Sequence, residues 1–380
     1  MTRPRLHEFL TGCSRTLRKS AAVWMALALV AVVASPVAAQ QAPAAPAYEV
    51  NDSHLHLWNY IQQGPTIQEF LKVMGTRVGR VAIFGLPLQQ MWSYGNSGDF
   101  APWYYTQTDA PLYYYSFVDA MMAMAYRSLT PQEQARFDPM IIGFNPADMY
   151  AADHIRRVLL TFPGVFSGIG EFTIHKEFVS AKTAGGPASL TDPALDRVFD
   201  FAAEAGLVVL LHCDVDTPFP RAGQDPYQAR QLGALFKRHP KTTTIWAHIG
   251  LGRVVHPIHD MLGMLERALN NPELKHVYFD LSWDETAKYL VATPEVKAAV
   301  AAMINRHPDR FLFGSDEVGP TDQAKYLKVY DIYAPLFAQL TPEAREKVKK
   351  GNYERLFDAA RVKVRAWEKA NANALRKETP

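Results

Sequence analysis

Cysteine is scarce in this sequence of 380 residues, which contains only Cys13 and Cys213. Cys13 lies in a segment that we expect to be removed, so Cys213 has no internal partner for a disulfide. A framework of disulfides is therefore excluded. Cys213 also follows His212 in a predicted strand and faces the opposite side, where we expect a buried and inert thiol.

An excess of charge of one sign is also missing. The sequence carries 40 basic and 38 acidic residues, a formal net charge of +2. Five of the basic residues and one acidic residue lie in the first twenty positions, so the chain after residue 39 has a net charge of −2. A nearly neutral body has no long-range attraction to nucleic acid or to an anionic membrane. We therefore expect no nucleic-acid partner.

The one long hydrophobic run covers residues 21–33. A basic stretch up to Lys19 precedes it and small residues at Val37 and Ala39 follow it, which is typical of a secretory signal peptide over residues 1–39. The run is too short to span about 30 Å of bilayer as a helix, and the Pro- and Ala-rich residues 40–47 are interpreted as a tether. We expect cleavage, no stable membrane span afterwards, and export, to the periplasm of a Gram-negative bacterium or otherwise as a secreted protein. An uncleaved membrane anchor is the alternative.

The remaining chain lacks linkers and repeats of solenoid period, which predicts a single domain over residues 48–380. Its short apolar or β-branched runs alternate with segments of helical periodicity, a pattern typical of βα units. Eight such runs are present, at residues 48–58, 78–87, 140–146, 166–175, 207–214, 243–250, 277–283 and 311–317. They predict an α/β fold of the (β/α)8 TIM-barrel class. A doubly wound open sheet is the alternative, but the glycine fingerprint expected after its first strand is missing.

Polar residues at the ends of these runs predict a metal site. The first run ends in His54-Leu55-His56, and both histidines face one side because side chains alternate along a strand. The carboxyl ends of parallel barrel strands open on one rim, so residues there converge although they are distant in sequence. Other runs contribute four more side chains that can bind a metal: Glu171, His212, His248 and Asp316.

These residue types indicate hydrolytic chemistry. A divalent cation held by neutral imidazoles can lower the pKa of bound water from about 16 toward 7, and the resulting hydroxide attacks polarised carbonyls. Asp316 could take the proton of the water and pass it to the leaving group, while His248 could donate a hydrogen bond to the substrate carbonyl oxygen. Imidazole and carboxylate ligands favour zinc, with manganese and iron as alternatives.

The ordered set of motifs resembles the amidohydrolase superfamily, and in particular the amidohydrolase-related branch that includes aminocarboxymuconate semialdehyde decarboxylase. The resemblance covers residues 48–360. Besides the His-X-His pair and the single histidines, it rests on Gly-Ser-Asp at residues 314–316 and on Gly-Asn-Tyr-Glu-Arg-Leu-Phe at residues 351–357.

The resemblance implies a role for each residue of the site. It implies metal ligation by His54, His56 and His212, with Asp316 as a ligand or general base. It makes His248 a second-metal ligand or a catalytic acid. Many members with two metals place a carboxylated lysine on the fourth strand, where this chain has Glu171. A glutamate could bridge two ions equally well, so a site with one ion and a site with two are both compatible with the sequence.

Three functions are compatible with these residues. The leading one is an exported metal-dependent hydrolase acting on a small ester, lactone or amide. The second is a metal-dependent nonoxidative decarboxylase of an unsaturated or aromatic acid. The third is a noncatalytic binding barrel, which predicts the loss of ligands at some strand ends, whereas all are present here. The expected partner is a small-molecule substrate.

A long aromatic-rich insertion, at about residues 88–138, follows the second strand on the active rim. Amphipathic aromatic side chains can line a substrate lid, which is one interpretation of the insertion. The alternatives are a contact surface between the subunits of a homo-oligomer and a small helical subdomain. The candidate substrate contacts, including three that follow later strands, are Trp92, Tyr94, His175, Arg253 and Trp283.

Overall fold

The computed structural model describes residues 48–59, 62–86, 90–92, 117–177, 179–181, 188–218, 220, 223 and 226–374. All of them belong to a compact unit, Pro46–Pro380. The predicted signal peptide, the tether and most of the insertion, including Tyr94 and the side chain of Trp92, lie outside the described residues. Among the helices of the described part, none combines the length and the apolar character needed to cross a membrane.

Nine parallel strands form one sheet in the order β10-β9-β8-β7-β5-β4-β2-β1-β11. Their bounds are β1 (Val50–His56), β2 (Val78–Phe84), β4 (Phe137–Ile141), β5 (Gly168–His175), β7 (Val208–Cys213), β8 (Thr244–Trp246), β9 (Val277–Asp280), β10 (Phe311–Leu312) and β11 (Glu317–Val318). A separate antiparallel pair joins β3 (Gln90–Trp92) to β6 (Val179–Ala181); the sequence patterns did not predict it.

Hydrogen bonds from β1 join the two ends of the strand order. The Ser53 amide donates to the Phe313 carbonyl (3.0 Å), and the Asp316 amide donates to the His54 carbonyl (2.8 Å). Phe313 and Asp316 lie between β10 and β11, so these two short strands are parts of one passage of the chain that lies beside β1. Together they occupy the eighth position of the barrel, and the predicted α/β TIM-barrel class is confirmed.

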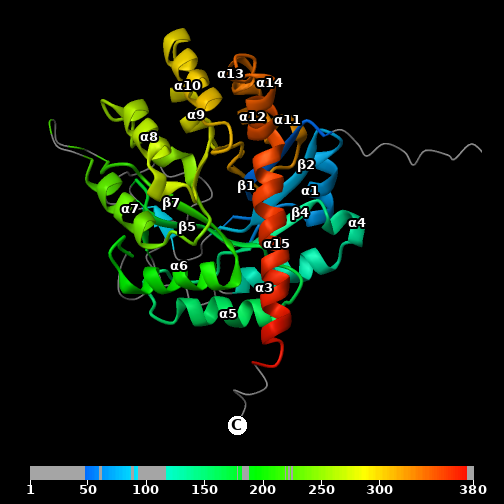
Figure 1. Cartoon of the computed structure of the whole chain (residues 1–380). Coiled ribbons are helices and arrows are strands. Elements are labelled where there is room, and N and C mark those ends of the chain that lie inside the picture. The colour runs from blue at the N-terminus through cyan, green and yellow to red at the C-terminus, as the bar shows by residue number, and fades with distance from the viewer. Residues whose placement is uncertain are drawn as a thin grey trace, which may run out of the picture. The chain divides into compact units, whose positions relative to one another are not determined.

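Helices connect the strands and cover the sheet (Figure 1). Their bounds are α1 (Ile67–Met74), α3 (Phe117–Arg127), α4 (Pro131–Gln134), α5 (Ala151–Thr161), α6 (Pro193–Ala205), α7 (Tyr227–Arg238), α8 (Met261–Asn270), α9 (Asp284–Leu290), α10 (Pro294–Arg306), α11 (Gln323–Tyr326), α12 (Lys328–Ile332), α13 (Ala334–Phe337), α14 (Pro342–Glu346) and α15 (Asn352–Asn371).

Local sequence signals set the limits of these elements, as α6 and β7 illustrate. Asp192 caps α6 by accepting the Ala194 amide, and Pro193 occupies the first turn, where a missing N–H costs nothing. Gly206 ends the helix in the left-handed region at φ 81°, a conformation that favours glycine. The chain then enters β7, whose residues are all buried, as expected of a parallel strand covered on both faces.

Three predicted strand limits were wrong. The predicted strand at residues 140–146 is shifted toward the amino terminus, because Phe137 already pairs with Val81 of β2. The strand predicted at residues 243–250 ends at Trp246, since His248 and Ile249 adopt left-handed backbone angles. The last predicted strand, at residues 311–317, is divided into β10 and β11.

The long helix α15 closes the amino ends of the strands. Figure 1 shows it in red beside β1. The side-chain Nδ2 of Asn51, at the start of β1, donates to the Glu354 carboxylate of α15 (3.0 Å). The buried Asp138 in β4 accepts from Tyr353 Oη (2.7 Å) and from Arg361 Nε (2.5 Å) of α15, and from Arg80 Nη2 of β2 (2.9 Å). Charge and hydrogen-bond capacity are thus matched at this end of the barrel.

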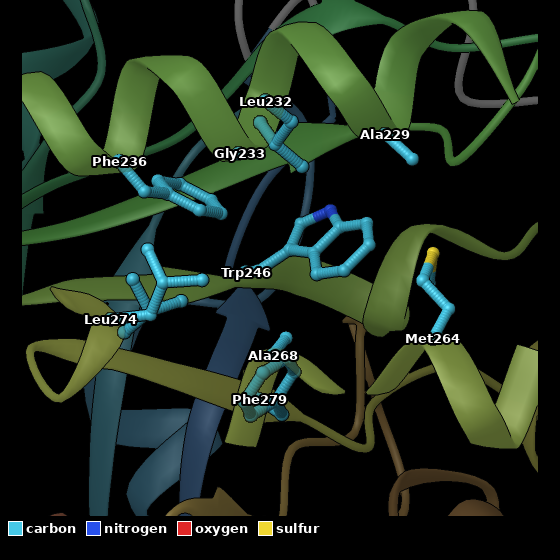
Figure 2. A pocket seen from close by; sticks show the side chains of 10 residues that line it. Ala229, Leu232, Gly233, Phe236, Trp246, Met264, Ala268, Leu274 and Phe279 are labelled. Atoms are coloured by element: carbon cyan, nitrogen blue, oxygen red, sulfur yellow. The ribbon is translucent and has the colours of Figure 1, made fainter. Parts of the chain in front are cut away.

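An apolar cavity of about 80 Å³ lies outside the barrel wall, between α7, α8 and the strands β8 and β9. Figure 2 shows Trp246 at its centre, between Leu232 and Phe236 of α7 and Met264 of α8. The Trp246 indole nitrogen donates to the Cys213 carbonyl (2.8 Å), which fixes the ring. This cavity is distinct from the cluster of polar residues at the carboxyl ends of the strands.

Candidate metal centre

His54 and His56 point to one side of β1, as their alternation predicts, and both are buried. The Nδ1 atom of His56 donates to the Gly85 carbonyl (2.7 Å), and Nδ1 of His54 lies 2.7 Å from Asp280 Oδ2. When the two rings are neutral, as metal ligation requires, these contacts place the proton on Nδ1 and the lone pair on Nε2. Both Nε2 atoms lie 3.1 Å from Asp316 Oδ1.

Asp316 reaches the two histidines because the chain turns sharply between β10 and β11. Its backbone is left-handed, at φ 53°. The buried Asp52 holds the preceding residue, since its carboxylate accepts from the amide (2.9 Å) and the hydroxyl (2.6 Å) of Ser315. Tyr326 donates a third hydrogen bond to Asp52 (2.9 Å). Burial raises the pKa of Asp52 to about 6, and these hydrogen bonds oppose that rise.

Glu171 lies between two groups of histidines. The preceding Gly170 packs so tightly on β7 that a side-chain carbon there would lie 2.1 Å from the Leu210 carbonyl oxygen, so only glycine fits. Glu171 Oε2 faces His56 Nε2 (3.4 Å), while Oε1 faces His212 Nδ1 (2.7 Å) and His248 Nε2 (3.2 Å). The carboxylate is therefore shared.

His248 is held by a left-handed turn and by a serine. Its φ is 55° and its side chain is fully buried. Ser282 Oγ, which follows β9, lies 2.7 Å from His248 Nδ1. The left-handed backbone bends the chain at the end of β8 and aims the ring into the barrel mouth. Backbone strain of this kind, when observed, is often found at functional sites.

The six residues form two overlapping groups of candidate ligands. In each group one donor atom per residue lies within 4.8 Å of the donor atoms of the others. The first group is His54, His56, Glu171 and Asp316, and the second is Glu171, His212 and His248. Glu171 belongs to both, which is the arrangement expected of a carboxylate that bridges two ions.

The electrostatics of the cluster suit a cation. Burial would raise the pKa values of Glu171 and Asp316, but both lie well below the usual range. The charges of Lys176, His212 and His54 lower the pKa of Glu171, and those of His54 and His248 lower the pKa of Asp316. Burial would lower the pKa of His54, but Asp316 and Glu171 outweigh it and raise that pKa well above normal. Both acids are thus ionised and face imidazole nitrogens.

The donor set passes a test of fit for a divalent metal. The Nε2 atom of His54 is fully buried and makes no hydrogen bond with any described residue, although carboxylate oxygens of Asp316 and Glu171 lie 3.1 and 3.8 Å away. A buried polar atom without a partner is costly, and a metal ion would satisfy it. Imidazole nitrogens and carboxylate oxygens are the ligands that zinc and similar ions use.

The other predicted site residues differ in their relation to this cluster. The Trp283 ring lies 5.1 Å from that of His248, and Arg253 lies over Trp283 (5.0 Å). His175 is partly buried and belongs to neither candidate ligand group. Cys213 is buried and free, and burial raises its pKa well above normal, as expected of an inert thiol.

The residues that orient the histidines were not predicted from the sequence. Asp280 and Ser282 contact His54 and His248, respectively. The signal for them was present: Asp280, Ser282 and their apolar neighbours alternate at the end of the seventh predicted strand, so both residues face the barrel interior with the predicted ligands. Lys176, directly after β5, was also missed.

Comparisons with known proteins identify the family and the fold. A family model described as amidohydrolase matches residues 52–359. An uncharacterised TIM-barrel protein from Bordetella bronchiseptica is similar in structure, with a TM-score of 0.51 and 16% identity over 82% of this chain and 99% of that one. An amidohydrolase from Burkholderia multivorans with bound zinc has a TM-score of 0.51 and 15% identity over 81% of this chain and 99% of that one. At these identities the likeness shows the fold. No curated protein matched the chain significantly.

Proposed function

The chain belongs to the amidohydrolase family, and from this premise we propose that it is a metal-dependent hydrolase of a small ester, lactone or amide. The observation that carries the proposal is the convergence of six potential ligands from five strand ends around the buried Nε2 atom of His54, which no described residue satisfies. A purely structural polar core would pair its buried atoms instead.

The candidate ligands would hold one or two ions, and their imidazole nitrogens and carboxylate oxygens match the preferences of zinc best. His54, His56 and Asp316 would hold the first ion, and His212 and His248 a second, with Glu171 shared between them. The chemistry that such a cation supplies when bound is the polarisation of a carbonyl and the acidification of water. Asp280 behind His54 and the Gly85 carbonyl behind His56 keep both rings oriented for this task.

The protein's own groups provide the proton transfers. Asp316 Oδ1 lies at the centre of the first group, where its carboxylate can accept a proton from the attacking water and return it to the leaving group. When the Ser282 hydroxyl donates to Nδ1 of His248, Nε2 carries the ring proton and can donate to a developing oxyanion. In a site with one ion His248 keeps this role, whereas in a site with two ions it would be a ligand instead.

Nonoxidative decarboxylation of an unsaturated or aromatic acid is the second candidate. The observation that favours it is a pair of cations, Lys176 and Arg253, on the indole of Trp283 beside His248. Such cations suit a substrate with a carboxylate. Export by the predicted signal peptide favours hydrolysis, because catabolic decarboxylases usually work in the cytoplasm. Export itself is tested by the amino-terminal sequence of the protein recovered from its native host, which we expect to begin after residue 39.

Metal analysis and paired substrate screens test the proposal. Protein purified without chelators should contain a divalent metal, cleave members of a panel of p-nitrophenyl esters and lactones, and lose that activity when the metal is stripped. Release of carbon dioxide from resorcylate-type acids without ester cleavage would replace hydrolysis by the second candidate. A folded, metal-free protein that is active on either panel would refute metal dependence.

A further inference from the structure

We propose that Lys176, Arg253 and Trp283 form an anion subsite beside the metal centre, which binds a carboxylate group of the substrate. The subsite deepens the proposed function, on which it rests for the nature of the neighbouring centre. It narrows the substrate to small organic acids whose reactive group lies a short distance from a carboxylate.

Lys176 is positioned by the end of β5. It directly follows His175, and although it is a lysine its side chain is almost entirely buried, with 7% of its surface exposed. Its ammonium nitrogen lies 5.2 Å from the centre of the Trp283 ring. A lysine this deeply buried near a barrel mouth is unusual, since most lysines keep their charge in water.

Trp283 links this ammonium to the candidate metal ligands. It is buried, and its left-handed backbone, at φ 76°, turns the chain after β9. The indole ring centre is 5.1 Å from that of His248 and 6.4 Å from that of His212. The indole therefore lies next to the second ligand group as well as next to the two cations.

Arg253 brings a second cation to the same indole from the loop after β8. Its guanidinium carbon lies 5.0 Å from the ring centre. Glu177 fixes that loop against the end of β5, because its Oε1 accepts from the amides of Arg253 (2.7 Å) and Val254 (3.2 Å). The Glu177 amide in turn donates to Asp214 Oδ2 (2.5 Å), just beyond β7. Three strand-end loops are thus tied together, and this holds both cations in place.

Lys176 directly follows β5, the strand that carries Glu171. Its ammonium lies over the ring of Trp283, which in turn lies beside His248. A substrate carboxylate that reaches the ammonium or the guanidinium would gain a charge-assisted hydrogen bond, and it would share the guanidinium with Glu177, whose Oε2 lies 3.7 Å from Arg253 Nη1.

The combination suits a carboxylate that is attached to an apolar body. A lysine point charge and a planar guanidinium suit a carboxylate, while the large indole provides an apolar wall for the carbon skeleton beside it. The nearly neutral charge of the chain after residue 39 gives no broad basic surface for a polyanion. The expected ligand is therefore a small molecule with a carboxylate on an apolar body.

Benzoate and benzamide provide the test, because they have almost the same shape but differ in charge. Their affinities for the full-length, metal-containing protein are measured by calorimetry. We expect benzoate to bind about tenfold more tightly, the effect of one charged hydrogen bond. Lys176→Met should erase this preference, and Lys176→Arg should retain most of it. Equal affinities in the wild type, or an unchanged preference in Lys176→Met, would overturn the proposal.

Controls separate the subsite from structural effects and from the proposed function. Lys288→Met removes another lysine that lies over an aromatic ring, 5.1 Å from Tyr289, but is half exposed and paired with Glu285; it should leave the preference unchanged. Should Lys176→Met prove unstable, Arg253→Met is measured instead, with the same two outcomes.

Metal content is measured on every variant, so a loss of metal with an unchanged benzoate preference would assign Lys176 to the support of Glu171 and overturn the proposed subsite. The preference is also measured after metal removal, so a failure of metal-dependent hydrolysis would not be mistaken for a failure of the subsite.

Discussion

The two ends of the barrel use buried charge in opposite ways. At the amino ends of the strands, the carboxylate of Asp138 is surrounded by Arg80, Arg361 and Tyr353, which match its charge and its hydrogen-bond capacity. At the carboxyl ends, the carboxylates of Glu171 and Asp316 crowd against four imidazoles, and Nε2 of His54 makes no hydrogen bond with a described residue.

This difference separates buried charge that stabilises the fold from buried charge that, in the proposed function, serves chemistry. Paired buried groups hold the helix α15 against the strands, and removing one partner leaves an uncompensated charge. Buried polar groups without a protein partner are costly unless a ligand such as a cation satisfies them. In a TIM barrel, residues at the amino face support the fold, and residues at the carboxyl face carry out the reaction.

The largest expected effect comes from Asp316→Asn at the carboxyl end. Loss of the acid that moves the proton should lower kcat by about 10²–10⁴-fold while most of the metal stays bound. Steady-state kinetics and metal analysis measure both quantities. Glu317→Gln is the matched control, because this neighbouring acid is partly exposed and pairs with Lys325 (3.0 Å). Normal turnover in Asp316→Asn would remove its assigned role.

At the amino end, Asp138→Asn should lower stability and leave the chemistry unchanged. Two arginines would lose their shared buried counterion, at a cost of about 3 kcal/mol in the free energy of unfolding. Denaturant unfolding measures this, and kcat of the folded protein should be unchanged. Asp358→Asn also removes a partner of Arg80, but Asp358 is 60% exposed, so the loss should stay below about 1 kcal/mol. If folded Asp138→Asn had a lowered kcat and an unchanged free energy of unfolding, the assignment of the amino end to stability would be wrong.

Asp280→Asn tests a residue that acts on the site through a histidine. The carboxylate orients His54, and its loss should weaken metal binding by about 10–100-fold. Competition with a metal indicator measures the affinity. Asp119→Asn is the control, since this buried acid accepts from the amides of Ile142 and Gly143 rather than from a histidine. Equal metal affinities for wild type and Asp280→Asn would contradict the proposed orientation.

The smallest effect is expected away from both ends, at the apolar cavity. Gly233 lies on α7 and lines the cavity, and a side-chain carbon there would meet no described atom within 4 Å. Gly233→Ala should therefore stabilise the protein by about 1 kcal/mol, since alanine favours the helix. Gly206→Ala is the opposing control, because φ there is 81° and the new carbon would lie 2.3 Å from Lys363 Cβ. A destabilised Gly233→Ala would show that the cavity is less open than described.

The sequence predicted the barrel and its eight strand positions because parallel strands appear as short apolar runs between helical segments. It also predicted that His54, Glu171, His212 and Asp316 would converge, since residues at the carboxyl ends of such strands share a rim. The structure brings them together as expected, and their chemical roles stay predictions.

Other features depend on backbone geometry that sequence periodicity does not encode. The strand predicted through residue 250 ends at Trp246 because His248 takes a left-handed conformation, which is uncommon for residues other than glycine and which the apolar pattern of the run does not signal. Lys176 follows the regular alternation of β5, where the chain turns, so its burial against Trp283 depends on contacts between loops. Such tertiary contacts are invisible to patterns within one strand.

The central claim is that these scattered residues bind a metal at the mouth of the barrel. Anomalous diffraction from crystals of the protein purified without chelators locates such an ion directly. We expect a peak about 2.0–2.2 Å from Nε2 of His54 and Nε2 of His56, with Asp316 beside it. Crystals grown with added zinc that show no peak among these residues would contradict the claim.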